Sequence, residues 1–105
     1  MPKSERDIIV YCTTWCPDCQ TTKRILNQNG VIFTAKDIEA DPVAEKEFLE
    51  LIQGGPHSVP RILIRDLSHD PSLSPKVLAT LIEPSPEQLL TTLQNFKFIK
   101  TDNVR

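Results

Sequence analysis

Hydrophobic residues along this chain form short continuous runs. Between these runs lie segments whose apolar residues recur at helical spacing and segments rich in turn-forming residues. Four runs rich in β-branched residues predict strands at residues 7–13, 31–38, 61–65 and 77–82. The first run contains Ile8-Ile9-Val10-Tyr11-Cys12 and is almost continuously apolar, which is typical of a strand buried on both faces. Cys12 is therefore interpreted as a small buried hydrophobic residue rather than as a redox group.

Apolar residues at helical spacing predict three helices between and after these runs. The first extends from Cys16 to the cap-forming Gly30. The second begins at Asp41-Pro42, an N-cap followed by proline at the first helical position, and it stops at Gly54-Gly55-Pro56. The third begins with the capping box Ser85-Pro86-Glu87-Gln88.

The resulting order of elements, β-α-β-α-β-β-α, predicts an α/β protein with the thioredoxin-like fold. A helical crossover between the first two strands implies that they are parallel, and the last two strands form an antiparallel pair in one four-stranded mixed sheet flanked by helices. Residues 1–105 are enough for a single domain. Residues 66–76 are rich in proline, serine and aspartate and predict a long loop, and residues 97–105 predict a polar tail.

Charge and composition narrow the range of partners. With 12 basic and 14 acidic residues the net charge is −2, which provides no electrostatic basis for binding nucleic acid or an anionic membrane. No apolar run approaches the roughly 18 residues of a membrane span, and residues 1–7 lack the apolar segment of a signal peptide. We expect a cytoplasmic monomer. Three cysteines, with one pair at motif spacing, do not indicate a disulfide framework.

The stretch Cys16-Pro17-Asp18-Cys19 carries the candidate chemistry. Two cysteines separated by two residues at the start of a helix bring their sulfurs close enough to form a disulfide or to bind a metal. Cys16 would lie where unpaired N–H groups and the positive helix end favour its thiolate, so it is the candidate nucleophile. Cys19, one turn further in, would be the resolving thiol. Pro17 suits the first helical turn, and Asp18 either opposes thiolate formation or is an inert surface carboxylate.

Three motifs in order along the chain resemble those of glutaredoxins. They are residues 11–19, with the cysteine pair, residues 54–60, Gly-Gly-Pro-His-Ser-Val-Pro, and residues 83–87, Glu-Pro-Ser-Pro-Glu. The second and third motifs most resemble the mycoredoxin-like branch, whose small thiol is mycothiol. The resemblance implies a thiol-disulfide oxidoreductase that reduces protein or low-molecular-weight mixed disulfides by a dithiol mechanism, with no bound cofactor. Its electron donor would be mycothiol, glutathione, or a flavoprotein thioredoxin reductase with NADPH.

The same resemblance assigns supporting roles to residues outside the cysteine motif. It implies a cis peptide bond between Val59 and Pro60, opposite the active cysteine, and a position for Trp15 as a lip over the disulfide. It also implies a groove for the small thiol or substrate, to which we assign Thr13, Tyr11, His57, Arg61 and Ser85. Plain packing is the alternative role for Trp15 and Tyr11, and helix capping is the alternative for Ser85.

Two positions depart from the glutaredoxin pattern. Glutaredoxins usually carry a lysine three residues before the first cysteine, and this chain has Thr13 there. They also carry two glycines and an aspartate near the start of the last helix, where this chain has Ile82 and Glu83 before Pro84. Both departures remove groups that contact glutathione in the family.

Two other classes of function compete with the oxidoreductase. In one, Cys16 and Cys19 hold an iron–sulfur cluster or zinc, across a dimer if necessary. A mononuclear zinc site normally needs four ligands, and His57 and His69 are far from the cysteines in the sequence, so we assign no metal ligand. The other class is an interaction protein with this fold and without turnover.

Overall fold

The computed structural model describes residues 6–67 and 76–99, and these residues form a four-stranded sheet and three helices. The elements follow the predicted order: β1 (Arg6–Cys12), α1 (Pro17–Gln28), β2 (Thr34–Asp37), α2 (Pro42–Ile52), β3 (Arg61–Asp66), β4 (Lys76–Ile82) and α3 (Pro86–Asn95). In this part of the chain no helix has the length and apolar character needed to cross a membrane.

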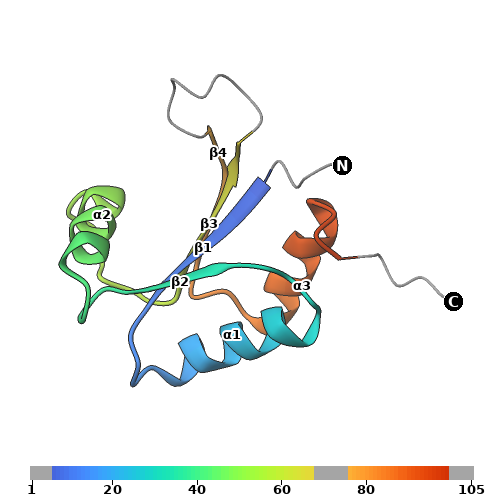
Figure 1. Cartoon of the computed structure of the whole chain (residues 1–105), viewed down its shortest axis with the longest axis horizontal. Coiled ribbons are helices and arrows are strands. Elements are labelled where there is room, and N and C mark those ends of the chain that lie inside the picture. Colours follow the sequence, from blue (N-terminus) through green and yellow to red (C-terminus); the bar gives the residue numbers. More distant parts are fainter. Residues whose placement is uncertain (1–5, 68–75, 100–105) are drawn as a thin grey trace, which may run out of the picture.

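The strands lie in the order β2-β1-β3-β4. β1 is parallel to β2 and antiparallel to β3, and β3 is antiparallel to β4. α1 and α3 lie together on one side of the sheet and α2 lies on the other (Figure 1). The α/β thioredoxin-like fold expected from the element order is therefore confirmed.

β1 is buried on both faces, as its continuous apolar run predicts. Ile8 and Val10 belong to the larger core cluster, which β1 and β3 share with α1 and α3. Ile9 and Tyr11 alternate with them and pack in a second cluster with Phe48 of α2. Because successive side chains of a strand point to opposite faces, a slip of one residue would exchange these two sets. The position at which β1 ends is therefore tightly determined.

β2 is shorter than predicted, because Val31 takes part in the hydrogen bonds that end α1 and the ladder with β1 includes no residue before Thr34. The Val31 N–H donates to the Leu26 carbonyl (3.0 Å) and the Gly30 N–H donates to the Asn27 carbonyl (3.1 Å). Gly30 has a φ of 69°, so these two bonds form a Schellman motif. Val31 is buried by this motif, and the ladder with β1 starts only at Thr34.

The predicted loop at residues 66–76 is shortened at both ends. Asp66 pairs with Lys76 in the β3–β4 ladder, so strand pairing continues to the point where the loop was expected to begin. Residues 68–75, which include His69, and residues 100–105 of the predicted tail lie outside the described residues.

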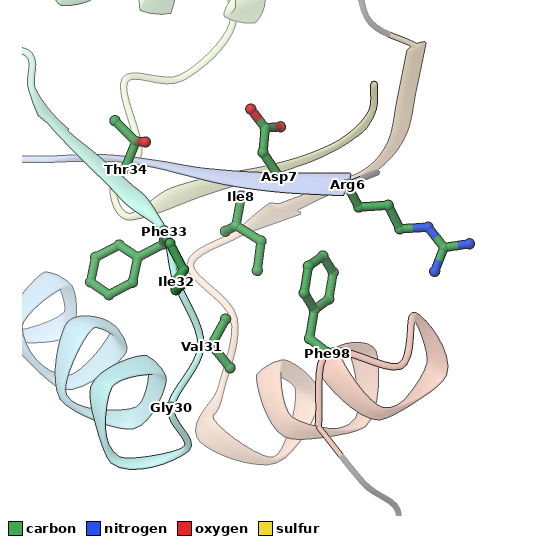
Figure 2. A pocket seen from close by; sticks show the side chains of 9 residues that line it. All are labelled: Arg6, Asp7, Ile8, Gly30, Val31, Ile32, Phe33, Thr34 and Phe98. Carbon is green, nitrogen blue, oxygen red and sulfur yellow. The ribbon is translucent and has the colours of Figure 1, made fainter. Parts of the chain in front are cut away.

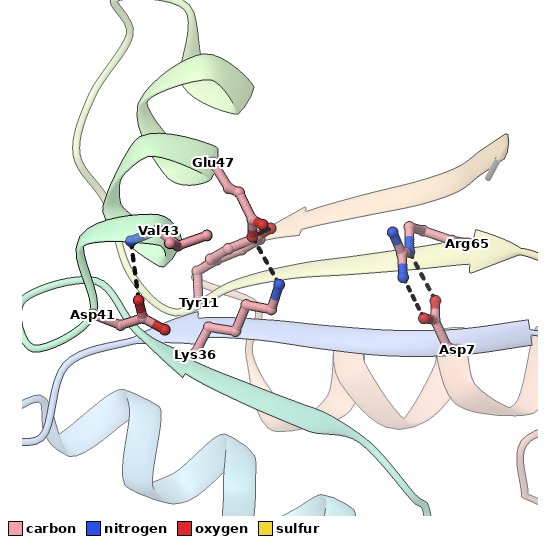
Figure 3. Close-up of polar contacts among 7 residues, drawn as sticks. All are labelled: Asp7, Tyr11, Lys36, Asp41, Val43, Glu47 and Arg65. Atoms are coloured by element: carbon pink, nitrogen blue, oxygen red, sulfur yellow. Dashed lines mark hydrogen bonds and ion pairs between the residues drawn. The ribbon is translucent and has the colours of Figure 1, made fainter. Parts of the chain in front are cut away.

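α2 and α3 begin at the caps that their sequences predict. The Asp41 carboxylate accepts a hydrogen bond from the Val43 N–H at 3.0 Å (Figure 3), and the Ser85 hydroxyl oxygen accepts one from the Gln88 N–H at 3.1 Å. Each bond satisfies one of the backbone donors that a helix N-terminus leaves unpaired. Proline follows at the first helical position in both helices.

Polar contacts tie α2 and the strands together (Figure 3). The Glu47 carboxylate of α2 accepts from the Tyr11 hydroxyl of β1 at 3.1 Å and from the Lys36 ammonium of β2 at 2.8 Å. Mainly because of the bond from Lys36, the pKa of Glu47 is lowered. Burial, followed by the hydrogen bond to Glu47, raises the pKa of Tyr11 to about 12, so the phenol stays protonated at neutral pH.

The cap of α2 gives a direct test of its contribution to stability. Replacing Asp41 by alanine should lower the free energy of unfolding by about 1 kcal/mol, because it removes the acceptor for the Val43 N–H. Asp41→Asn retains a good capping oxygen and should keep most of that stability. Urea denaturation of the three proteins measures the difference, and equal losses in both variants would contradict the capping role.

Candidate active site

Cys16 is the N-cap of α1, at the end of the turn that follows β1. Its sulfur accepts a hydrogen bond from the Cys19 N–H at 3.4 Å, and its backbone φ of −82° and ψ of 117° are those of an extended N-cap residue. The thiol thus occupies the place where a serine or aspartate oxygen usually caps a helix. The N–H groups that a helix leaves unpaired at its N-terminus lie at this position.

Cys19 lies one helical turn further in and is completely buried, whereas Cys16 keeps 6% of its surface exposed. Burial is the main reason that the pKa of Cys19 is raised to about 12, and its proximity to Cys16 adds to the shift. A thiol with this pKa remains protonated at neutral pH. Cys16 is therefore the thiol that solvent or a substrate can reach first.

Val59 and Pro60 lie opposite Cys16, and their peptide bond is cis, as the resemblance predicts. The Cys16 thiol points toward the Val59 carbonyl oxygen, with 3.9 Å between sulfur and oxygen. Pro60 is buried and Val59 is half-buried. The turn from β1 and the segment before β3 thus meet at the same sulfur, although 43 positions separate the two residues.

A pocket of about 330 Å³ shares Val59 with this site, although Cys16 is not among the residues that line it. Residues of the cysteine turn, of the β2–α2 connection, of α2 and of the segment before β3 line it: Thr13, Trp15, Ile38, Glu39, Glu45, Phe48, Leu49, His57 and Val59. Of the residues assigned to a groove from the sequence, Thr13 and His57 line the pocket. Its wall includes two carboxylates and one imidazole.

Trp15 and Thr13 both line the pocket, but they differ in exposure and in hydrogen bonding. Trp15 is 66% exposed, and its indole N–H donates to the Glu39 carboxylate at 2.8 Å. It is therefore a surface residue held by a hydrogen bond, not a core residue. Thr13 is 2% exposed, and its hydroxyl oxygen has no hydrogen-bond partner within residues 6–67 and 76–99.

Tyr11, Arg61 and Ser85 are not among the residues that line the pocket. Tyr11 is buried beneath α2. The Arg61 guanidinium covers the Phe48 ring at 5.6 Å and donates to the Pro56 carbonyl oxygen at 3.1 Å, and the residue is 6% exposed. Ser85 caps α3. These three residues therefore have structural partners, which agrees with the packing and capping alternatives for Tyr11 and Ser85.

The remaining residues around the motif have simpler positions. Pro17 is the first residue of α1, and Asp18 is an exposed acidic side chain in its first turn. Cys12 is 2% exposed in the larger core cluster, and burial raises the pKa of its thiol. All three cysteines are free thiols. Cys12 therefore has the buried environment expected of a small hydrophobic residue.

A second pocket of about 250 Å³ lies near the start of β1, at the end of that strand remote from Cys16 (Figure 2). Ile8, Val31 and Phe98 converge on it (Figure 2), and its lining contains no cysteine or histidine. Among residues 6–67 and 76–99 no group of three or more His, Cys, Asp or Glu side chains is placed to hold a metal ion. The described side chains thus offer no single-chain support for the metal-binding alternative.

The mixed four-stranded sheet with three helices gives the protein a thioredoxin-like fold. The glutaredoxin family model matches residues 8–68, which is more than half of the chain. The chain belongs to the glutaredoxin family, and this fold and family support a thiol-disulfide oxidoreductase role in general. A comparison with curated proteins finds no match.

Solved structures show the same fold at low sequence identity. The glutaredoxin of Archaeoglobus fulgidus is 20% identical, with a TM-score of 0.59, and the alignment covers 84% of this chain and 86% of that one. Oxidised thioredoxin from Plasmodium falciparum is 14% identical, with a TM-score of 0.63 and coverages of 89% and 82%. Trichomonas vaginalis thioredoxin is 19% identical, with a TM-score of 0.63 and coverages of 87% and 78%.

Glu39 and Glu45 line the pocket but are not among the residues predicted for the site, although the sequence carries a signal for them. Because β1 and β2 are parallel, the residues that follow the two strands meet at one edge of the sheet. The Ile38 N–H donates to the Cys12 carbonyl at 3.0 Å, which brings the start of the β2–α2 connection beside the cysteine turn. Acidic residues that follow the second strand could therefore have been expected at the site.

The raised pKa of Cys19 predicts that the reduced protein loses stability in alkali. The pKa lies near 9 in the unfolded chain and at about 12 in the folded one, so the unfolded chain releases its proton first as the pH rises. The stability linked to this thiol is complete below pH 9 and declines as the pH rises toward about 12. Urea midpoints of the protein, kept reduced by a phosphine, should fall between pH 8.5 and 10.5.

Substitutions separate the groups responsible for this decline. Cys19→Ala should flatten the dependence on pH, and Cys12→Ala should flatten it in part, because burial raises the pKa of that thiol as well. Tyr11→Phe should flatten it at the alkaline end, because the Tyr11 pKa is also raised. Thr22→Ala, which changes another buried side chain of α1 without removing a titratable group, should keep the wild-type slope. The assignment is wrong if Cys19→Ala has the same slope as Thr22→Ala.

Proposed function

We propose that this protein reduces disulfides of proteins or small thiols by a dithiol mechanism in which Cys16 attacks and Cys19 resolves. The observation that carries the proposal is the position of the two sulfurs: Cys16 is at the N-terminus of α1 and 6% exposed, and Cys19 lies one turn further in and is fully buried. Cys12 takes no part in the reaction, because its thiol is buried in the core.

In the first step the Cys16 thiolate attacks one sulfur of the substrate disulfide. A bond forms between the Cys16 sulfur and that atom, the substrate S–S bond breaks, and the other substrate sulfur leaves as a thiolate that takes a proton from water. The N–H of Cys19, which donates to the Cys16 sulfur, stabilises the thiolate before the attack. The product is a mixed disulfide between Cys16 and the substrate.

In the second step Cys19 loses its proton and attacks the Cys16 sulfur. The Cys16–Cys19 disulfide forms, and the remaining substrate sulfur leaves as a thiolate and is protonated. Over both steps the substrate gains two electrons and two protons. The protein supplies both electrons and the Cys19 proton, and water supplies the second proton. Because the pKa of Cys19 is about 12, this thiol stays protonated in the resting protein and does not compete with Cys16 for the first attack.

Val59 has a supporting role in this mechanism. Its carbonyl oxygen lies 3.9 Å from the Cys16 sulfur, so a substrate disulfide that reaches Cys16 must also pass the Val59 backbone. An extended substrate segment would hydrogen-bond to that backbone as a short added strand. Pro17 contributes by starting α1 without leaving a further N–H unpaired.

The oxidised protein must be reduced again by an external donor. We propose mycothiol, glutathione or a flavoprotein reductase with NADPH, acting in a reducing compartment such as the cytoplasm. Thr13 lies where relatives carry a lysine for a glutathione carboxylate, so reduction by glutathione lacks that cation. We therefore expect glutathione to be the slowest of the three donors.

Trapping the mixed disulfide between Cys16 and a substrate tests the mechanism. In Cys19→Ser the second step is blocked, so incubation with hydroxyethyl disulfide should leave a stable mercaptoethanol adduct on Cys16, detected by mass spectrometry of the intact protein and its peptides. Cys12→Ala combined with Cys19→Ser should form the same adduct. Cys16→Ser, which retains only the buried Cys19 and Cys12, should form none.

An adduct on Cys12, or equal adduct formation in Cys16→Ser, would refute the assigned roles. Metal analysis of the anaerobically purified protein is the companion measurement. Iron or zinc in stoichiometric amount would favour a metal-binding module over the oxidoreductase.

A separate measurement identifies the donor. The isolated oxidised protein is mixed in single-turnover reactions with glutathione, with mycothiol, or with a thioredoxin reductase and NADPH, and the appearance of free thiols is followed. Thr13→Lys should accelerate the reaction with glutathione by a few-fold, because the lysine adds a cation that can attract a carboxylate of glutathione. An unchanged glutathione rate in Thr13→Lys would show that the missing cation does not limit this donor.

A further inference from the structure

We propose that the pocket beside Cys16 is a subsite for a basic side chain, lysine or arginine, next to the disulfide of a protein substrate. This inference rests on the proposed oxidoreductase function and names its substrate class. The pocket holds about 330 Å³ and shares Val59 with the site of the reacting sulfur. A residue that flanks the substrate cysteine can reach it while the disulfide meets Cys16.

The floor of the pocket is suited to the aliphatic part of a long side chain. Ile38, Phe48 and Leu49 line it, and Phe48 is 1% exposed within the cluster beneath α2. Lysine and arginine bury their methylene stems against such surfaces while the charged end stays near polar groups. A short polar side chain would leave this apolar surface uncovered.

The charge of the pocket favours a cation. Glu39 and Glu45 line it, and within residues 36–47 five carboxylates stand against two lysines. One of these lysines, Lys36, is already bound to Glu47 at 2.8 Å. His57 is the other titratable residue of the lining. An ammonium or guanidinium group entering the pocket thus meets a surplus of negative charge.

Trp15 adds an aromatic surface to this arrangement. Its indole N–H is bonded to Glu39, and two-thirds of the side chain is exposed beside the pocket. Cations bind favourably to the face of an indole ring, and arginine does so more often than lysine. The bond to Glu39 reduces the freedom of Trp15, so less conformational entropy is lost when a substrate arrives.

The Thr13 hydroxyl is an independent sign that the pocket accepts a ligand. The residue is 2% exposed, it lines the pocket, and its oxygen has no partner in the described parts of the chain. A buried hydroxyl without a hydrogen bond is unfavourable, and a donor on a bound substrate would satisfy it. The N–H groups of a lysine or arginine end are such donors.

Peptides that each contain one cysteine, joined by a disulfide to 2-mercaptoethanol, test the proposal. One peptide has lysine on both sides of the cysteine, and a second, otherwise identical peptide has glutamate at both positions. A third peptide with glutamine at both positions is the neutral reference. The measured quantity is the second-order rate constant for oxidation of the reduced protein, at low ionic strength and neutral pH.

Wild-type protein should react about tenfold faster with the lysine peptide than with the glutamate peptide. In the double variant Glu39→Gln with Glu45→Gln the ratio should fall to about two, because glutamine keeps the shape and the Trp15 acceptor but loses the charge. Glu50→Gln, on the exposed side of α2 outside the pocket, should keep the wild-type ratio. Added salt should reduce the wild-type preference.

A ratio near one in wild type, or an unchanged ratio in the double variant, would overturn the subsite. If the glutamine peptide is still reduced in that case, the oxidoreductase function stands and only the subsite is lost. If wild-type protein reduces none of the three peptides, the proposed function and the subsite both fail. Equal urea midpoints of the variants and wild type establish that the comparison concerns folded protein.

Discussion

The active site depends on the burial of β1 on both of its faces. Ile8 and Val10 pack under α1 and α3, while Ile9 and Tyr11 pack under α2, so the strand has a single allowed register. Its end is therefore fixed, and a short turn delivers Cys16 to the N-terminus of α1. A thiol at this position meets the N–H groups that the helix leaves unpaired.

Burial then separates three chemically identical thiols into three roles. Cys16 keeps a small exposed surface, Cys19 is buried one turn behind it, and Cys12 lies in the core at the end of β1. The pKa of Cys19 and that of Cys12 are both raised, mainly by burial. The order of attack in the proposed mechanism thus arises from packing rather than from a special base beside the nucleophile.

The residues that line the pocket of about 330 Å³ come from several segments of the chain, and no single sequence motif contains them. The parallel pairing of β1 and β2 brings the cysteine turn next to the β2–α2 connection, so Glu39 and Trp15 form a hydrogen bond at the rim. The carboxylates of Glu39 and Glu45 line this pocket, and Thr13 lines it with a buried hydroxyl. The negative charge at the pocket therefore comes from the β2–α2 connection and α2 rather than from the cysteine motif.

The amino-acid sequence by itself determined the order of elements, the doubly buried β1, the caps of α2 and α3, and the cysteine pair at the start of α1. Residues close together in the chain control these features, through hydrophobic period and backbone hydrogen bonding. Only the tertiary structure decided that Val31 completes the end of α1 rather than starting β2, and that Arg61 stacks on Phe48 instead of facing the pocket. It also decided that Glu39 and Glu45 line the same pocket as Thr13 and Val59. Such contacts join segments far apart in the sequence, and local patterns carry no information on which side chains will meet once the sheet has formed.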